Sequence, residues 1–343
     1  MTRAWIALLV SLLPACVGGE DTSASEGREC LPAPQPSPTP APARRRAEGP
    51  RLRVLGIAQD GGLPHVACDC PRCEAARTDP TRASAVASVA LIAPESGAVW
   101  LVDATPDLPA QLDLLADVRR RSPGARPAAV DRDPLAGIFL THAHMGHYLG
   151  LAHLGYEAAA SEGTPVHASA RMLAFLGQNA PWDQLLRLGN IEAHPAEPGR
   201  PIALAEGLQA EALAVPHRAE YTDTFAWYLA GPRKRVLYIP DTDPWHRWTD
   251  SLERALTDVD LLLVDGTFYS GDELPGRDIA EIGHPLIVDT MERLTPQVAA
   301  GKLEVWFIHL NHSNPALDPT GPERAAIEAG GFRVAVPGDE YAL

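Results

Sequence analysis

The sequence predicts an α/β fold, a layered sandwich of strands and helices that begins near Arg51 and continues to the end of the chain. From that point on, short apolar runs typical of strands alternate with longer helix-like runs. No repeat of fixed period interrupts them, and polar residues concentrate where the apolar runs end. Interleaved strands and helices favour a sandwich, so we expect the functional residues at the strand ends.

The individual elements follow from these runs. Strands are expected at Arg51–Ala58, Val86–Ala93, Val99–Asp103, Gly137–Leu140, Glu211–Val215, Thr224–Leu229, Arg235–Ile239, Asp260–Val264 and Glu304–Ile308. Helices are expected at Pro109–Arg120, Ala168–Asn179, Arg247–Leu256, Leu286–Leu294 and Pro322–Ala329. A chain of 343 residues that is 45% hydrophobic suits one large domain or two smaller ones, and we expect one, over residues 51–343.

The first fifty residues predict export and a tether. Arg3 precedes an apolar run, Ala4–Leu13, that is too short for a stable bilayer anchor. Leu13-Pro14-Ala15-Cys16 resembles the lipobox of bacterial lipoproteins, which implies a signal peptide at 1–16 and a lipid on Cys16; an ordinary signal peptide is the alternative. Because residue 17 is Val rather than Asp, we expect the outer membrane of a Gram-negative host, facing the periplasm. The proline-rich residues 17–50 predict a disordered linker.

The charge distribution argues against nucleic acid as a partner. The formal net charge is -15, and the five arginines and five acidic residues of positions 1–50 cancel, so the whole negative charge lies on residues 51–343. Phosphate binding requires clustered Lys and Arg, which this acidic body lacks. We expect instead a small-molecule substrate and, through the lipid anchor, a membrane.

Three histidines within six residues predict a metal site. His142, His144 and His147 follow directly after an apolar strand-like run. Neutral imidazoles are common ligands of zinc and iron, and a loop after a strand can turn His142 and His144 to the same side. The alternative is a solvated loop that happens to be rich in histidine.

This segment resembles the His-x-His-x-Asp-His motif of the metallo-β-lactamase superfamily, which implies an αββα sandwich with two metals at its edge. Later strand ends resemble the superfamily's other positions in the correct order, at Asp103, His217, Asp241 and His309. The resemblance implies a first metal site of His142, His144, His217 and Asp241. It implies a second site of His147 and His309 with Asp241 as the bridge, and a supporting role for Asp103.

One position departs from the motif, because Gly146 stands where the superfamily has an aspartate that binds the second metal. We therefore expect a weak or empty second site. Three histidines with an open position suit a hydrolytic zinc, whereas histidines with one carboxylate also suit non-haem iron, and manganese is a further alternative.

Cys68, Cys70 and Cys73 predict a separate structural zinc site. Three thiolates within six residues cannot pair off as disulfides, and zinc takes four ligands. The arrangement resembles the phosphodiesterases of phosphonate breakdown, which pair such a Cys-x-Cys-x-x-Cys with a late histidine, and this implies His312 as the fourth ligand. A redox or disulfide role is the alternative.

A second resemblance spans the whole domain, to the family of pyrroloquinoline quinone biosynthesis protein B. It rests on the segments Gly56–Gly62, Cys68–Cys73, Ala104–Asp107, Asp265–Phe268, Gly283–Pro285 and Ile308–Pro315. That family lacks the full histidine motif and is expected in the cytoplasm. The histidines and the export signal of this chain therefore indicate a relative with a different task.

The function predicted first is metal-dependent hydrolysis, in which a metal-held hydroxide attacks an ester, phosphodiester or lactone. Asp241 would hold or orient the hydroxide, and His284 would contact the substrate or act as a general acid. Asp265 is a candidate support, and Trp245 and Trp248 are candidate walls of the site. An iron-dependent oxygenase is the second hypothesis, and a non-catalytic binding lipoprotein is the third.

Overall fold

The structure is a computed structural model that describes residues 49–119, 130–218, 220–248, 252–273, 276, 281 and 283–343. The predicted signal peptide, Cys16 and all of the linker except residues 49 and 50 lie outside the described residues. The described residues all fall within one compact unit, Arg46–Leu343. Of the described helices, none has the length and apolar composition needed to cross a membrane.

Two seven-stranded mixed sheets form the centre of this unit. The first sheet has the order β14 (Glu340–Ala342), β1 (Arg51–Gly56), β2 (Ser88–Ala93), β3 (Ala98–Val102), β4 (Gly137–Phe139), β5 (Thr164–Ala168) and β6 (Ile191–Pro195). The second has the order β13 (Arg333–Val334), β12 (Glu304–Ile308), β11 (Leu261–Asp265), β10 (Arg235–Ile239), β9 (Phe225–Ala230), β8 (Gln209–Ala214) and β7 (Ile202–Ala203).

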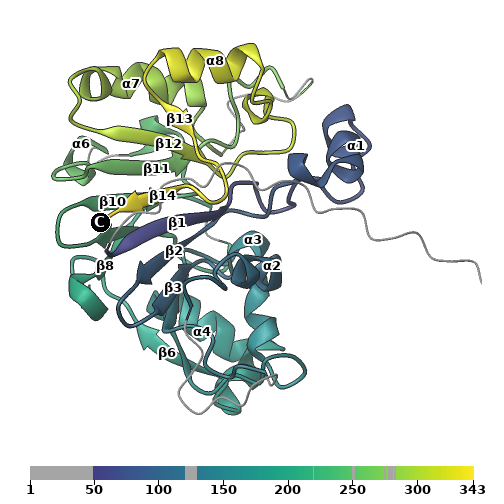
Figure 1. Cartoon of the computed structure of the whole chain (residues 1–343), viewed down its shortest axis with the longest axis vertical. Helices are drawn as coiled ribbons and strands as arrows, with labels where there is room; N and C mark the ends of the chain where they lie inside the picture. The colour runs from purple at the N-terminus through teal and green to yellow at the C-terminus, as the bar shows by residue number, and fades with distance from the viewer. Residues whose placement is uncertain are drawn as a thin grey trace, which may run out of the picture. The chain divides into compact units, whose positions relative to one another are not determined.

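Helices cover the outer faces of both sheets (Figure 1). The helices on the first sheet are α2 (Leu108–Asp113), α3 (Met145–Tyr148), α4 (Ala170–Gln178) and α5 (Trp182–Arg187). Those on the second are α6 (Leu252–Ala255), α7 (Ile287–Ala299) and α8 (Pro322–Ala329), while α1 (Pro71–Thr78) stands away from both sheets. Short 3-10 helices lie at Pro80–Arg82, Leu149–Leu154, Ala205–Gly207, Trp245–Arg247 and Pro315–Leu317. This is the predicted αββα sandwich, so the fold class is confirmed.

The alternation of side chains along β2 shows why the first sheet is buried on both faces. Val89 and Leu91 belong to the core between the sheets, whereas Ala90 and Ile92 belong to the core beneath α2, α4 and α5. Successive side chains of a strand point to opposite faces, so a strand covered on both sides is apolar throughout. Every residue of β2 is buried accordingly.

Strand direction brings the candidate residues to one edge of each sheet. Strands β3 to β6 are parallel, as are β10 to β13, and β8 runs in the same direction as β10 because β9 is antiparallel to both. The carboxyl ends of these strands therefore share an edge. The loops at the two edges are joined: the Phe225 amide donates to the Thr141 carbonyl at 2.9 Å, and the Ala143 amide donates to the Thr222 hydroxyl at 3.1 Å.

Two helices end at residues different from those that the sequence predicted. The run Pro109–Arg120 is helical only to Asp113, because the amides of Leu115, Ala116 and Val118 then bond to carbonyls three residues back and the chain continues as tighter turns. The run Leu286–Leu294 continues to Ala299 through Pro296. The bounds of β10, β12 and α8 are those predicted.

Candidate metal centre

The predicted first-site residues converge at the joined strand ends. His142 and His144 follow β4, His217 follows β8, and Asp241 follows β10. His142 Nε2 lies 2.7 Å from His144 Nδ1, and His217 Nε2 lies 3.3 Å from the same atom. The Asp241 carboxylate lies 3.1 Å from His217 Nε2, 3.3 Å from His142 Nε2 and 3.6 Å from His144 Nδ1. Ligands about 2.0–2.2 Å from a tetrahedral zinc are roughly 3.3–3.6 Å apart. The separations here run from 2.7 to 3.6 Å, so a small outward adjustment of the closest pair would let all four residues bind one ion.

The opposite nitrogens of two of these rings, those of His142 and His144, are held by other groups. His142 Nδ1 lies 2.9 Å from the Thr141 hydroxyl, and His144 Nε2 lies 3.1 Å from a Glu220 carboxylate oxygen. Metal-binding histidines usually use their second nitrogen in this way, which fixes the ring and aims the first nitrogen at the metal. The site is therefore oriented for a cation.

Asp103 supports the loop that carries His142 and His144, as the resemblance to the superfamily implied. It has a positive φ of 70°, which is uncommon for a non-glycine residue. Its carboxylate accepts hydrogen bonds from the Thr141 amide and hydroxyl, each at 2.9 Å, and lies 2.7 Å from His147 Nδ1. His309, at the end of β12, also has a positive φ, 64°. Strained backbone of this kind is retained where the surrounding contacts require it, and here both residues lie at the candidate site.

A second group of donor atoms lies beside the first. It contains His147 and His309, as expected, together with Asp60, and these three ligand atoms lie within 4.8 Å of one another. The rings of His142 and His147 are 4.2 Å apart, so the two groups adjoin. Sequence reasoning missed Asp60, because an Asp-Gly-Gly segment after a strand is typical of an ordinary turn. The missing aspartate at Gly146 was the one signal that a carboxylate was needed from elsewhere.

His284 lies at the side of the first group and is held by two carboxylates. Its Nδ1 lies 2.9 Å from Asp265 Oδ2 and 3.2 Å from Asp241 Oδ1. Asp265 also accepts hydrogen bonds from the Thr267 amide and hydroxyl. Burial acts to lower the pKa of His284, but the charges of Asp265 and Asp241 outweigh it and raise that pKa well above its usual value. The two carboxylates therefore favour the protonated form of His284.

Buried charges of both signs crowd the centre. Burial acts to raise the pKa of Asp241, but the charges of His217 and His284 lower it well below its usual range. Burial, together with the charge of His147, lowers the pKa of His142 well below its usual value. Burial acts to lower the pKa of His147 as well, yet Asp103 raises it to about 9. This pattern of ionised carboxylates among competing imidazoles is one that a bound cation would compensate.

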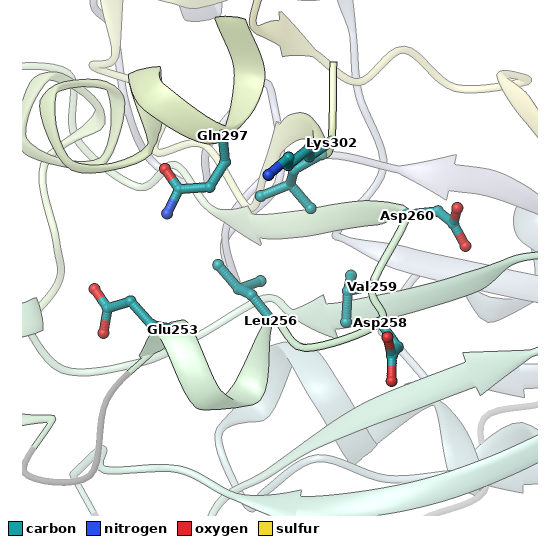
Figure 2. Close-up of a pocket in the computed structure, with 8 residues that line it drawn as sticks. Glu253, Leu256, Asp258, Val259, Asp260, Gln297 and Lys302 are labelled. Atoms are coloured by element: carbon teal, nitrogen blue, oxygen red, sulfur yellow. The ribbon is translucent and has the colours of Figure 1, made fainter. Parts of the chain in front are cut away.

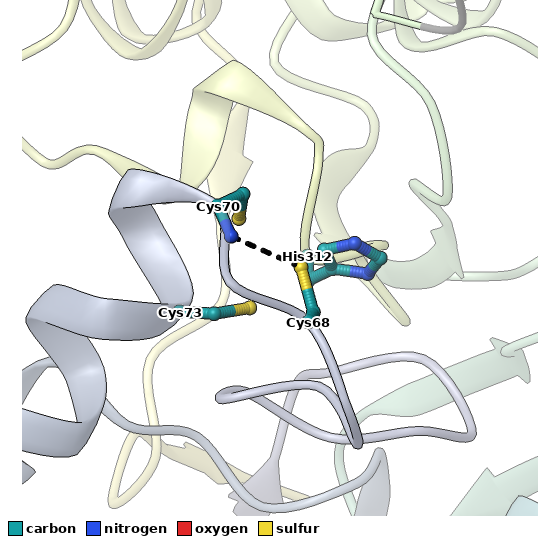
Figure 3. Close-up of side chains that lie close together, drawn as sticks. All are labelled: Cys68, Cys70, Cys73 and His312. Carbon is teal, nitrogen blue, oxygen red and sulfur yellow. Dashed lines mark hydrogen bonds between the residues drawn. The ribbon is translucent and has the colours of Figure 1, made fainter.

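The three cysteines form a separate cluster, and His312, the residue expected as the fourth ligand, lies beside them. The sulfur atoms of Cys68, Cys70 and Cys73 and a ring nitrogen of His312 lie within 4.8 Å of one another. Figure 3 shows Cys70 and Cys73, at the start of α1, pointing toward Cys68 and the ring of His312. All three cysteines are free thiols. Burial raises the pKa of the Cys73 thiol to about 11. A metal would hold that thiol in the ionised form.

Trp245 and Trp248, the candidate walls of the site, donate their indole N–H groups to threonines and not to the metal groups. Trp245 Nε1 donates to the Thr290 hydroxyl at 2.9 Å, and Trp248 Nε1 donates to the Thr242 hydroxyl at 3.0 Å. Both indole N–H groups are thus used internally, beside Asp241. Their packing supports the loop that follows β10.

A cavity of about 540 Å³ lies at the opposite end of the second sheet, among residues that precede β11 and β12 (Figure 2). It is lined on one side by Glu253 of α6 and on the other by Gln297 of α7. Glu253 is paired with Arg293, and Asp260 is paired with Lys234. Both of these carboxylates are therefore paired. The cavity is remote from the metal groups, which lie at the carboxyl ends of the strands.

Comparison with known proteins agrees with the geometry. Residues 100–310 match the Beta-lactamase superfamily domain. The chain is 30% identical over 325 residues to coenzyme PQQ synthesis protein B of Rhodopseudomonas palustris, covering 85% of this chain and 99% of that protein. The corresponding protein of Xanthomonas campestris is 29% identical over 313 residues, with 85% and 100% covered.

Solved structures show the same fold. Zinc-bound PqqB from Methylobacterium extorquens superposes with a TM-score of 0.69 at 24% identity, covering 85% of this chain and 100% of that one. A diphosphatase from the PhnP family superposes with a TM-score of 0.59 at 19% identity, covering 85% and 96%.

Proposed function

Because this chain belongs to the metallo-β-lactamase superfamily, as a relative of coenzyme PQQ synthesis protein B, we propose that it is a metal-dependent hydrolase of a small molecule. The observation that carries the proposal is the convergence of His142, His144, His217 and Asp241, whose ligand atoms are 2.7 to 3.6 Å apart. A zinc ion bound there would supply a Lewis acid and a water molecule whose pKa is lowered to about 7. Esters, phosphodiesters and lactones are the substrates suited to that chemistry.

The chain's own residues complete the reaction. Asp241 lies between His217 and His284, so its carboxylate can orient the attacking water. His284 has its Nδ1 fixed by Asp265 and Asp241, which leaves Nε2 to hold the proton for the leaving group. Asp265 is a positioning residue, since it acts on the substrate only through His284. Proton donation to the departing oxygen would complete hydrolysis.

The direct test measures turnover and metal content together. Protein starting at Arg51, purified without added metal and then loaded with zinc or manganese, should hydrolyse a p-nitrophenyl ester, bis(p-nitrophenyl) phosphate or a chromogenic lactone. Iron in the purified protein, with oxygen uptake and no hydrolysis, would instead support the oxygenase. A complete metal complement with neither activity would support a binding protein.

His284→Ala is expected to lower kcat about 10²–10⁴-fold, the usual contribution of a general acid. The loss should be smaller for a substrate with a p-nitrophenolate leaving group than for one with an alkoxide leaving group, because only the poorer leaving group needs the proton. Metal content should not change. Equal losses on both substrates would contradict the general-acid role.

We propose from the sequence that the enzyme is exported and anchored in the outer membrane through lipid on Cys16, facing the periplasm. Cys16→Ser should abolish palmitate labelling in cells and move the protein from the membrane fraction to the soluble fraction. Cys30→Ser, the matched change within the linker, should leave both unchanged. Membrane retention of the Cys16→Ser protein would contradict the lipid anchor.

A further inference from the structure

We propose that Asp60 is the carboxylate ligand of a second metal ion, held together with His147 and His309, and that it replaces from another loop the aspartate missing at Gly146. This inference deepens the proposed function and rests on it for the presence of the adjoining first site. It reverses the expectation of a weak or empty second site, because the lost ligand is compensated within the same space.

The contact between Asp60 and Gly146 carries the first step. The Gly146 amide donates to Asp60 Oδ1 at 3.0 Å. A Cβ atom at position 146 would lie 2.3 Å from that oxygen and 2.8 Å from the Asp60 Cα, distances that packed atoms do not reach. The side chain of Asp60 thus occupies the volume in which a residue 146 side chain would begin. An aspartate at both positions cannot be accommodated without displacement.

The backbone conformation at position 146 does not require glycine. The residue lies in α3 and is not among the glycines with a positive φ. Glycine inside a helix costs about 1 kcal/mol relative to alanine, so its presence calls for a compensating gain. The close approach of Asp60 supplies that gain.

The two histidines present donor atoms that have nothing else to bind. His147 and His309 are fully buried. Their Nε2 atoms have no hydrogen-bond partner among the described residues. Their Nδ1 atoms are fixed, that of His147 by Asp103 at 2.7 Å and that of His309 by the Thr267 hydroxyl at 3.1 Å. Buried polar atoms are rarely left unpaired, and an ion is one of the few explanations for two of them that face a carboxylate.

The spacing also fits an ion better than a direct hydrogen bond. Asp60 Oδ1 lies 3.7 Å from His147 Nε2, beyond hydrogen-bond range. Two atoms that share a zinc ion lie roughly 3.3–3.6 Å apart, so a small adjustment brings both into contact with one metal. The Asp60 side chain is 21% exposed, which leaves a route for the ion and for coordinated water.

The loop that carries Asp60 is fixed to the loop that carries His309. The Gln59 amide donates to the Leu310 carbonyl at 2.9 Å, and the Asn311 side chain donates to Gln59 Oε1 at 2.6 Å. Asp60 is therefore positioned relative to His309 by contacts adjacent to both residues. Such supporting contacts are what place a ligand accurately enough to bind metal.

The test counts metal ions and measures the affinity of each. Wild-type protein dialysed against zinc should hold three ions per chain by mass spectrometry: one at the cysteines and two at the centre. Asp60→Asn keeps the size of the side chain and an oxygen for the Gly146 amide, but it loses the charge. It should hold two ions, with the affinity for the third weakened more than about 100-fold, since altering only the supporting partners of a ligand costs 10–100-fold.

The reciprocal swap provides the sharpest readout. Gly146→Asp alone should disturb the site, because both carboxylates then compete for one volume. Asp60→Gly with Gly146→Asp should recover three ions per chain. Asp113→Asn, which neutralises an exposed carboxylate of α2, should bind as the wild type does.

Each outcome decides the proposal. It is overturned if wild-type protein holds only two ions, if Asp60→Asn retains the third ion at unchanged affinity, or if the double substitution recovers nothing while remaining folded by circular dichroism. It stands if the third ion is lost in Asp60→Asn and is recovered when the aspartate is moved from position 60 to position 146. Three ions with no hydrolysis of any substrate would leave this ligand assignment standing and remove the proposed function alone.

Discussion

His142→Ala is expected to lower hydrolytic turnover at least about 10²–10³-fold, the loss that follows removal of one group that stabilises the transition state. The substitution deletes a member of the first group whose Nε2 lies 2.7 Å from His144 Nδ1 and 3.3 Å from Asp241. Metal content should fall by one ion at the centre while the ion at the cysteines remains.

The matched control is His153→Ala, which removes an exposed histidine of the 3-10 helix Leu149–Leu154. Its turnover and metal content should equal those of the wild type. Unchanged turnover in His142→Ala, measured on protein with its full metal complement, would show that the chemistry takes place elsewhere.

Cys70→Ala is expected to remove one zinc ion and to lower the free energy of unfolding by more than about 3 kcal/mol, because a structural metal contributes its binding energy to folding. The surrounding core is too small to replace it. The local hydrophobic cluster contains only four buried residues: Ala58, Leu63, Cys73 and Ala76. Without the metal, α1 and the segment before it would depend on that cluster and on a few hydrogen bonds, such as that of Arg72 to the His312 carbonyl.

Urea denaturation with and without a zinc chelator measures this effect. The chelator should destabilise the wild type by at least as much as the substitution does, because it also removes the ions proposed at the centre, and it should destabilise the Cys70→Ala protein by less than the wild type. A wild type that ignores the chelator, or a variant with unchanged zinc content, would contradict the structural zinc site. Loss of reactive thiols without loss of zinc would support the redox alternative.

The structural site should also influence the catalytic centre. Cys68 follows Asp60 by eight residues, and His312 follows His309 by three, so the cysteine cluster joins the two loops that carry second-site residues. Arg72 adds a hydrogen bond to the His312 carbonyl at 2.8 Å. Loss of a zinc ion bound at the cysteines is therefore expected to loosen Asp60 relative to His309. It should weaken the second metal before it affects the first.

The sequence by itself determined the features that depend on short stretches of chain. Each core strand near the centre is an apolar run, so its end, and hence the place of Asp103, His142, Asp241 and His309, could be located from local pattern. The cysteine cluster and the histidine motif were equally visible, because their ligands lie within six residues. Strands β5 and β6 were missed: both contain histidine and proline, and neither has a continuous apolar run.

Only the tertiary structure decided how the second site is completed. Asp60 and Gly146 are 86 residues apart, and nothing in the local sequence of either indicates the other. Their approach depends on the pairing of the β1 loop with the β12 loop and on the packing of α3 against both. A local pattern can place a residue at the end of a strand, but the packing of distant segments decides which carboxylate fills the space that a glycine leaves open.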